Sequence, residues 1–308
     1  MRKPLFLMLG FAVCLAAGAW LAGRPAWAQN QVEERIRVRV ERVPVVFSAF
    51  DRKERFVKDL DKSEIEVFDN KRKQEILDFV QETDLPLRIG LLIDVSNSIR
   101  DRFKFEQEAA VEFLQSAVRP NQDSAFVVGF DTSAEVAQDF TDDVNHLASA
   151  IRGLRPGGGT ALYDALYYAI RDKLMDEELP GGVRRTIIVI GDGEDNSSRA
   201  SREDTLAMAQ RGEVTIFAIS TNMTGLMQRG DKVLERFAGE TGGRVFHPFR
   251  ATDLTNTFEQ ISEELRSQYA ILYRPTTARD GKFHPIEVVS KRKGVKIRAR
   301  KGYFADRD

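Results

Sequence analysis

The sequence contains very little cysteine and histidine. Its only cysteine, Cys14, lies in an apolar run near the start of the chain, and histidine occurs three times. The residues after that run contain no thiol, which excludes disulfide bonds, thiolate metal sites and cysteine nucleophiles there. No glycine-rich stretch ends in Gly-Lys-Ser or Gly-Lys-Thr, so a P-loop for nucleotide phosphates is also excluded. Stability must come from packing of the hydrophobic residues, which make up 42% of the chain.

An excess of charge of one sign is absent as well. The chain has 46 Lys and Arg against 47 Asp and Glu, which gives a net charge of −1. This balance argues against nucleic acid as the main partner, because proteins that bind nucleic acid usually carry a strongly basic surface.

The first 28 residues have the features of an export signal. The basic pair Arg2-Lys3 precedes an apolar run over residues 5–23, and Ala26-Trp27-Ala28 forms a small-x-small cleavage site. We therefore expect an exported protein, periplasmic or secreted. The apolar run is long for a signal peptide, so the alternative is an uncleaved membrane anchor.

The rest of the chain shows two kinds of pattern. Apolar residues alternate with period two up to about Glu82 and again after residue 268, which predicts short β-strands. Between these segments, apolar runs too continuous for half-exposed strands alternate with helical segments, as in a doubly wound α/β domain with a mostly parallel sheet and helices on both faces. These runs cover residues 89–93, 125–130, 186–190 and 214–219.

The predicted organisation follows from these patterns. It is a signal peptide (1–28), an N-terminal β-strand segment (29–85), an α/β domain (86–267) and a C-terminal β-strand segment (268–308). One helix of the α/β domain is expected to begin at a cap on Ser201, and another to run from about 254 to 267. Periodicity leaves open whether the two strand segments pair into one small β module, although domain termini often lie close together.

Three segments of the α/β domain carry oxygen-bearing side chains next to predicted element ends. A buried strand runs into Asp94-Val95-Ser96-Asn97-Ser98, which by itself fits a helix cap as well as a ligand site. Gly157-Gly158-Gly159-Thr160 is a glycine-rich loop that opens a helix. Ile190-Gly191-Asp192-Gly193 is a second apolar strand that ends in an acid.

The usual strand order brings these segments together. In a doubly wound sheet the first and fourth strands lie side by side, and ligands bind at their carboxyl ends. We therefore expect Asp94 and Asp192 to be neighbours, with Thr160 in the same crevice. The oxygens of this set suit Mg²⁺, Mn²⁺ or Ca²⁺, and a small number of ligands with room for water favours Mg²⁺.

Asp94-x-Ser96-x-Ser98, followed by distant Thr160 and Asp192, resembles the metal-ion-dependent adhesion site of von Willebrand factor type A domains. The resemblance implies that Ser96, Ser98 and Thr160 bind the metal directly, Thr160 in the ligand-competent state. It implies that Asp94 and Asp192 act largely through coordinated waters. Neutral hydroxyl ligands leave the cation enough positive charge to take a carboxylate from a protein partner.

The flanking segments resemble those of exported bacterial type A-related proteins described largely from acidobacteria. The resemblance is carried by four short stretches, at residues 43–46, 56–60, 269–275 and 300–304. It bears on architecture more than on function.

These observations predict an exported, non-enzymatic binding protein. A metal hydrolase needs a general acid or base beside the metal, but His146, His247 and His284 are on unrelated elements. Phosphoaspartate chemistry needs a second acid two residues after Asp94, where this chain has Ser96. After the metal-binding residues, Glu194 and Asp195 are expected to lie in a solvated loop.

A second functional hypothesis concerns the basic C-terminal strands. They would bind an anionic polymer or a membrane surface, and the metal would only stabilise the fold. The simpler interpretation is a solvated outer strand face, because strand alternation alone produces one. The basic residues are Lys291, Arg292, Lys293, Lys296, Arg298, Arg300 and Lys301.

Overall fold

The computed structural model describes residues 42–81, 85–97, 103–175, 183–222, 224–248, 250 and 253–307. The expected signal peptide and Ser98 lie outside these residues, so the predictions made for them stay predictions. Within the described part of the chain, no helix has the length and apolar character needed to cross a membrane.

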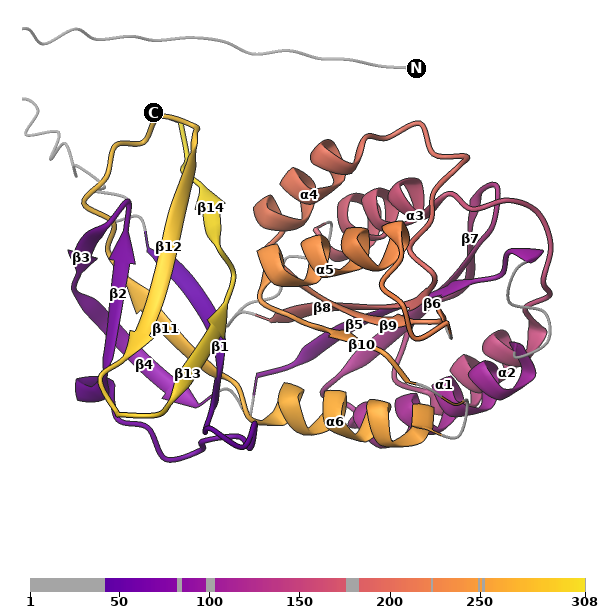
Figure 1. Cartoon of the computed structure of the whole chain (residues 1–308), viewed down its shortest axis with the longest axis horizontal. Helices are drawn as coiled ribbons and strands as arrows, with labels where there is room; N and C mark the ends of the chain where they lie inside the picture. Colours follow the sequence, from indigo (N-terminus) through magenta and orange to yellow (C-terminus); the bar gives the residue numbers. More distant parts are fainter. Residues whose placement is uncertain are drawn as a thin grey trace, which may run out of the picture. The chain divides into compact units, whose positions relative to one another are not determined.

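A six-stranded sheet forms the centre of the α/β domain (Figure 1). Its strands are β5 (Leu87–Asp94), β6 (Ser124–Phe130), β7 (Ala134–Thr141), β8 (Arg184–Gly191), β9 (Val214–Ser220) and β10 (Val245–Phe246). They are ordered β10-β9-β8-β5-β6-β7, and all neighbours are parallel except β6 and β7. The predicted doubly wound sheet is confirmed, and its first and fourth strands, β5 and β8, lie side by side.

Helices cover both faces of this sheet, as predicted (Figure 1). Leu91 and Ile93 face the core beneath one set of helices, whereas Leu92 faces the core beneath the other. The first set is α1 (Phe103–Ala117), α2 (Val144–Gly153) and α6 (Leu254–Arg266). The second is α3 (Leu162–Tyr168) with the π-helical turn η4 (Ala169–Leu174), α4 (Arg202–Arg211) and α5 (Arg229–Thr241). Ser201 caps α4 by accepting a hydrogen bond from the Asp204 N–H, as expected.

Strands from both ends of the chain form two four-stranded sheets. Before the α/β domain come β1 (Val43–Phe50), the 3-10 turn η2 (Lys62–Glu64), β2 (Ile65–Asp69), β3 (Arg72–Gln74) and β4 (Ile76–Gln81). After it come β11 (Tyr269–Tyr273), β12 (Phe283–Ser290), β13 (Lys296–Ala299) and β14 (Gly302–Phe304). The orders are β13-β1-β11-β4 and β14-β12-β2-β3. The strands that precede the α/β domain therefore pair with those that follow it, and we call the two sheets the β module.

The β module has a hydrophobic core of its own, to which both sheets contribute. Phe47 of β1 stacks on Tyr269 of β11 with ring centroids 5.3 Å apart. The turn between β2 and β3 has two central residues with positive φ, Asn70 at 49° and Lys71 at 64°. Such a two-residue turn matches the twist of paired antiparallel strands.

A buried acid on α6 connects the α/β domain to the β module. The Glu264 side chain is fully buried, and its Oε1 accepts hydrogen bonds from the Ser48 hydroxyl at 3.0 Å and from Arg298 at 2.7 Å. Its Oε2 lies 3.2 Å from Arg244 Nε. Ser48 is on β1 and Arg298 on β13, so one carboxylate holds residues from two strands of the module.

Candidate metal site

Asp94 is the last residue of β5 and is almost completely buried. Its Oδ1 accepts a hydrogen bond from the Ser96 backbone N–H at 2.7 Å, but its Oδ2, also buried, has no hydrogen-bond partner among the described residues. Burial raises the pKa of Asp94 to about 6, against the hydrogen bonds from Ser96, and the nearby Asp192 and Asp131 raise it further. A buried carboxylate oxygen without a donor, close to two other acids, fits a site for a cation.

Asp192 follows β8 directly and lies on the same edge of the sheet. Gly191, the residue before Asp192, lies next to the Asp94 side chain. A Cβ atom on Gly191 would lie only 3.2 Å from Asp94 Oδ2. Asp192 Oδ1 accepts the Glu194 N–H at 2.9 Å, which fixes the direction of the loop. The strand order thus brings the two acids together, as the sequence led us to expect.

The glycine-rich loop packs on the segment that follows β5. The Gly157 N–H donates to the Val95 carbonyl at 2.6 Å, and Asn97 Nδ2 donates to the Gly158 carbonyl at 3.2 Å. Gly158 has a φ of +70°, and a Cβ atom there would lie 2.7 Å from Asp131 Oδ2. Only glycine satisfies both conditions, so the loop can approach the end of β6 closely.

Thr160 ends this loop and is held from the other side by Asn196. Its N–H donates to Asn196 Oδ1 at 3.0 Å, and its carbonyl accepts the Asn196 N–H at 2.9 Å. Thr160 is buried. The structure therefore gathers Asp94, Ser96, Thr160 and Asp192 at the carboxyl ends of β5 and β8.

Asp131 belongs to the same cluster, although sequence reasoning did not single it out. It follows β6, the neighbour of β5, and its carbonyl accepts the Ala161 N–H at 2.5 Å. Its charge helps to raise the pKa of Asp94. The signal was present, because the apolar run 125–130 also ends in an acid. We found no sequence signal for Asn196, whose role depends on a contact between two loops.

Glu194 and Asp195 lie in a loop, as expected, with Glu194 exposed and Asp195 partly buried, but both also accept hydrogen bonds from backbone N–H groups. Asp195 Oδ2 accepts the N–H of Tyr163 at 3.0 Å, near the start of α3. Glu194 Oε1 accepts the N–H of Gly230 at 3.1 Å, near the start of α5. The two acids therefore bind the free backbone donors of two helices, and they anchor the loop that carries Asp192.

The chemistry of the site is that of hydroxyl and carboxylate oxygens. Within the described ranges, no three His, Cys, Asp or Glu side chains are placed to hold a metal ion by themselves, and this includes the neighbouring acids Asp94, Asp131 and Asp192. A cation at this edge would therefore need hydroxyl ligands such as Ser96 and Thr160 in addition to the acids. Such hard oxygen ligands suit Mg²⁺, Mn²⁺ or Ca²⁺.

The expectation of an outer basic face on the C-terminal strands was wrong for Arg298 and Arg300, whereas Arg292 is partly exposed but paired with acids. Arg292 pairs with Asp59 at 2.7 Å and with Glu64 at 2.6 Å. Arg298 pairs with the buried Glu264, and Arg300, itself buried, lies 3.0 Å from Glu213. These arginines form ion pairs with acids on distant elements. Strand alternation in the sequence cannot predict such pairs. Lys291, Lys293, Lys296 and Lys301 are exposed.

Comparison with known proteins agrees with this fold. Residues 89–194 match the family model of the von Willebrand factor type A domain. No curated protein matches the sequence.

Solved structures extend the comparison. Proximal thread matrix protein 1 from the mussel byssus is 20% identical with a TM-score of 0.53, and the match covers 64% of this chain and 50% of that one. Another structure of it, with a zinc-occupied MIDAS motif, is 20% identical with a TM-score of 0.52, covering 62% and 48%. A von Willebrand factor type A protein from Catenulispora acidiphila is 13% identical with a TM-score of 0.51, covering 86% and 74%.

At these identities the solved structures show a shared fold, and this chain spans about half the length of the mussel protein. The family match lies on the strands that carry Asp94 and Asp192, within the doubly wound sheet described above. The chain therefore contains a von Willebrand factor type A domain.

Proposed function

We propose that this chain is an exported, non-enzymatic binding protein that uses a metal-ion-dependent adhesion site to bind an acidic group of a protein partner. The observation that carries the proposal is the buried Asp94 Oδ2, which has no hydrogen-bond donor among the described residues and lies beside further acids. The proposed metal ligands are Asp94, Ser96, Ser98, Thr160 and Asp192, and the proposed ion is Mg²⁺.

The chain's own residues would fix the ligands before the cation binds. The Ser96 N–H orients Asp94, Asn196 holds Thr160, and Glu194 fixes the loop of Asp192. When bound, the cation supplies a positive charge that attracts a carboxylate of the partner. Because the serine and threonine hydroxyls are neutral, they leave most of that charge available.

Two further observations support parts of this proposal. The zinc in the MIDAS motif of the mussel protein supports a divalent ion at this type of site, and the all-oxygen ligand set favours Mg²⁺ over zinc here. The export signal expected over residues 1–28 supports a function outside the cytoplasm.

Calorimetric titration with Mg²⁺ tests the metal site. Asp94→Ala removes the buried carboxylate and is expected to weaken Mg²⁺ binding about tenfold to a hundredfold, as is typical when a group that acts through coordinated water is lost. Asp306→Ala removes an exposed aspartate of the β module and is the matched control, with wild-type affinity expected. Equal tight binding by wild type and Asp94→Ala contradicts the proposal.

Affinity capture from the native envelope fraction tests the role of the metal in partner binding. A partner held through the cation is expected to dissociate when a chelator is added and to return with Mg²⁺. Binding through the exposed lysines of the C-terminal strands instead weakens steeply with salt and is insensitive to chelator. The second outcome would favour the polyanion hypothesis.

A further inference from the structure

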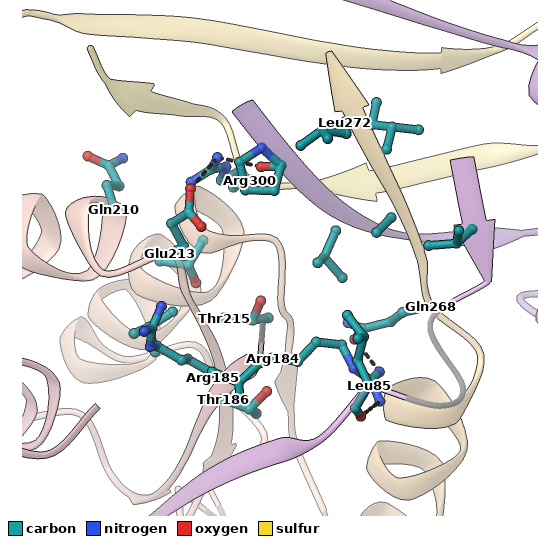
Figure 2. A pocket seen from close by; sticks show the side chains of 18 of the residues that line it. Leu85, Arg184, Arg185, Thr186, Gln210, Glu213, Thr215, Gln268, Leu272 and Arg300 are labelled. Atoms are coloured by element: carbon teal, nitrogen blue, oxygen red, sulfur yellow. Dashed lines mark hydrogen bonds and ion pairs between the residues drawn. The ribbon is translucent and has the colours of Figure 1, made fainter. Parts of the chain in front are cut away.

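A cavity of about 910 Å³ lies at the amino-terminal ends of β8 and β9, where they face β1, β4 and β11 of the β module (Figure 2). Residues 184–186 at the start of β8 line it, whereas Asp192 follows the end of that strand. The cavity is therefore at the opposite edge of the six-stranded sheet from the candidate metal site, and nothing in the proposed adhesion mechanism uses it.

Most of the cavity wall is apolar. The β module contributes Val46, Val80, Ala270 and Leu272, and the α/β domain contributes Val183 and Val214. Val80 is 43% exposed and so offers apolar surface to a ligand in the cavity. The volume lies within the range of about 300–1,000 Å³ that is typical of small-molecule sites, whose walls are also mostly apolar.

Arg300 places a positive charge in this wall. It is only 8% exposed, and its Nη2 donates to the Pro44 carbonyl at 2.6 Å and to Glu213 Oε1 at 3.0 Å (Figure 2). Its Nε and Nη1 are buried and have no hydrogen-bond partner within the described part of the chain. One nitrogen thus fixes the guanidinium while the other two keep unused N–H groups, which a buried cation retains only at a cost in free energy.

The charged residues around the cavity, Arg300 included, favour an anion. Three arginines line it, at positions 184, 185 and 300, against the two acids Asp78 and Glu213. Arg184 is engaged in the wall itself, donating to Gln268 Oε1 and to the Leu85 carbonyl, each at 3.3 Å (Figure 2). Arg300 is therefore the residue best placed to receive a ligand.

From this arrangement we propose that the cavity binds an amphipathic small molecule whose apolar body lies between the β module and the α/β domain and whose carboxylate accepts hydrogen bonds from Arg300. The apolar wall accounts for the body of the ligand, and the unused Arg300 donors account for its head group. The proposal is independent of the metal site.

Dodecanoate is the probe, added below its micellar concentration to compete with a dansyl-labelled fatty acid on the purified chain. Saturable displacement is expected. 1-Dodecanol, which has the same chain without the charge, is expected to compete about tenfold to a hundredfold more weakly, because a hydrogen bond to a charged group is lost. Arg300→Met is expected to remove this preference for the acid.

Filling the cavity provides a second test. Ala270→Trp places a large side chain in the cavity wall and is expected to abolish dodecanoate binding, whereas Ala278→Trp, in an exposed loop, is the matched control. No saturable binding, equal competition by dodecanol, or binding unchanged by Ala270→Trp would each overturn the proposal. Mg²⁺ titration of the same variants separates this result from the fate of the metal site.

Discussion

Two buried aspartates lie at opposite ends of β5 and differ in what surrounds them. At the amino-terminal end, Asp123 Oδ1 accepts the N–H of Leu87, the first residue of the strand, at 2.8 Å. Arg119 and Arg266 each donate to Asp123 Oδ2 at 2.8 Å. At the carboxyl end, Asp94 has two acids as its charged neighbours and one oxygen without a donor in the described structure.

The consequence appears in the pKa values of the two groups. Burial raises the pKa of Asp123, but hydrogen bonds from Arg119, Leu87 and Arg266 outweigh burial and hold it at about 2. Burial raises the pKa of Asp94 to about 6 because the hydrogen bonds from Ser96 do not compensate for it. The protein thus supplies its own cations at one end of the strand, whereas the other end fits an external one.

The largest effect is expected from Asp123→Ala. It leaves Arg119 and Arg266 partly buried without their acid, and breaking such a pair typically costs about 3–5 kcal/mol. Urea denaturation measures the loss. Glu108→Ala removes an exposed acid that pairs with Arg152 at 2.7 Å, and is expected to have a much smaller effect, because solvent screens surface ion pairs. If the two variants lose equal amounts of unfolding free energy, Arg119 and Arg266 do not stabilise Asp123 more than a surface ion pair would.

Asp94→Asn is expected to have opposite effects with and without a divalent ion. In a chelator it removes a buried charge that has no compensating cation, so the variant should be more stable than wild type by roughly 1–3 kcal/mol. With Mg²⁺ at a thousand times its dissociation constant, wild type gains about 4.1 kcal/mol by linkage, and the variant does not. The order of stability then reverses.

Thermal denaturation in chelator and in Mg²⁺ measures both effects. Asp306→Asn, at an exposed position, is the control and should respond to Mg²⁺ as wild type does. If Asp94→Asn is less stable than wild type in chelator, Asp94 Oδ2 has a favourable partner other than a cation, and the contrast between the two ends of β5 disappears.

The cluster of acids at the carboxyl end of β5 could be predicted from sequence, because it depends on the order of the strands in the sheet. Buried parallel strands have continuous apolar runs, and the doubly wound order then places Asp94 beside Asp192 without any knowledge of side-chain contacts. The same argument, applied to every run, would also have found Asp131. Asn196 could not be found in this way, because it reaches Thr160 from a separate loop.

The amino-terminal end could not be predicted because it depends on side-chain pairs between distant segments. Arg266 reaches Asp123 from α6, and Arg298 reaches Glu264 from a strand of the β module. Alternation in the sequence shows which residues share a strand face, but not which element packs on that face. For this reason Arg298 and Arg300 were expected on an outer surface, whereas Arg298 pairs with the buried Glu264, and Arg300 is itself buried and pairs with Glu213.

The smallest of the three effects is expected in an acid titration, which tests how the amino-terminal end of β5 differs from its carboxyl end. The pKa of Asp123 falls from its ordinary value of 3.8 to about 2 on folding, so the unfolded chain binds this proton more tightly. The stability that Asp123 contributes is therefore present above about pH 4 and is lost as the pH falls through about 2, by roughly 2 kcal/mol.

Urea midpoints of wild type and Asp123→Asn between pH 5 and 2 measure this loss, because other acids contribute equally to both proteins. Their difference in stability should shrink by that amount. A constant difference would show that the arginines do not hold Asp123 in its ionised form, and the amino-terminal end of β5 would then need another explanation for its buried acid.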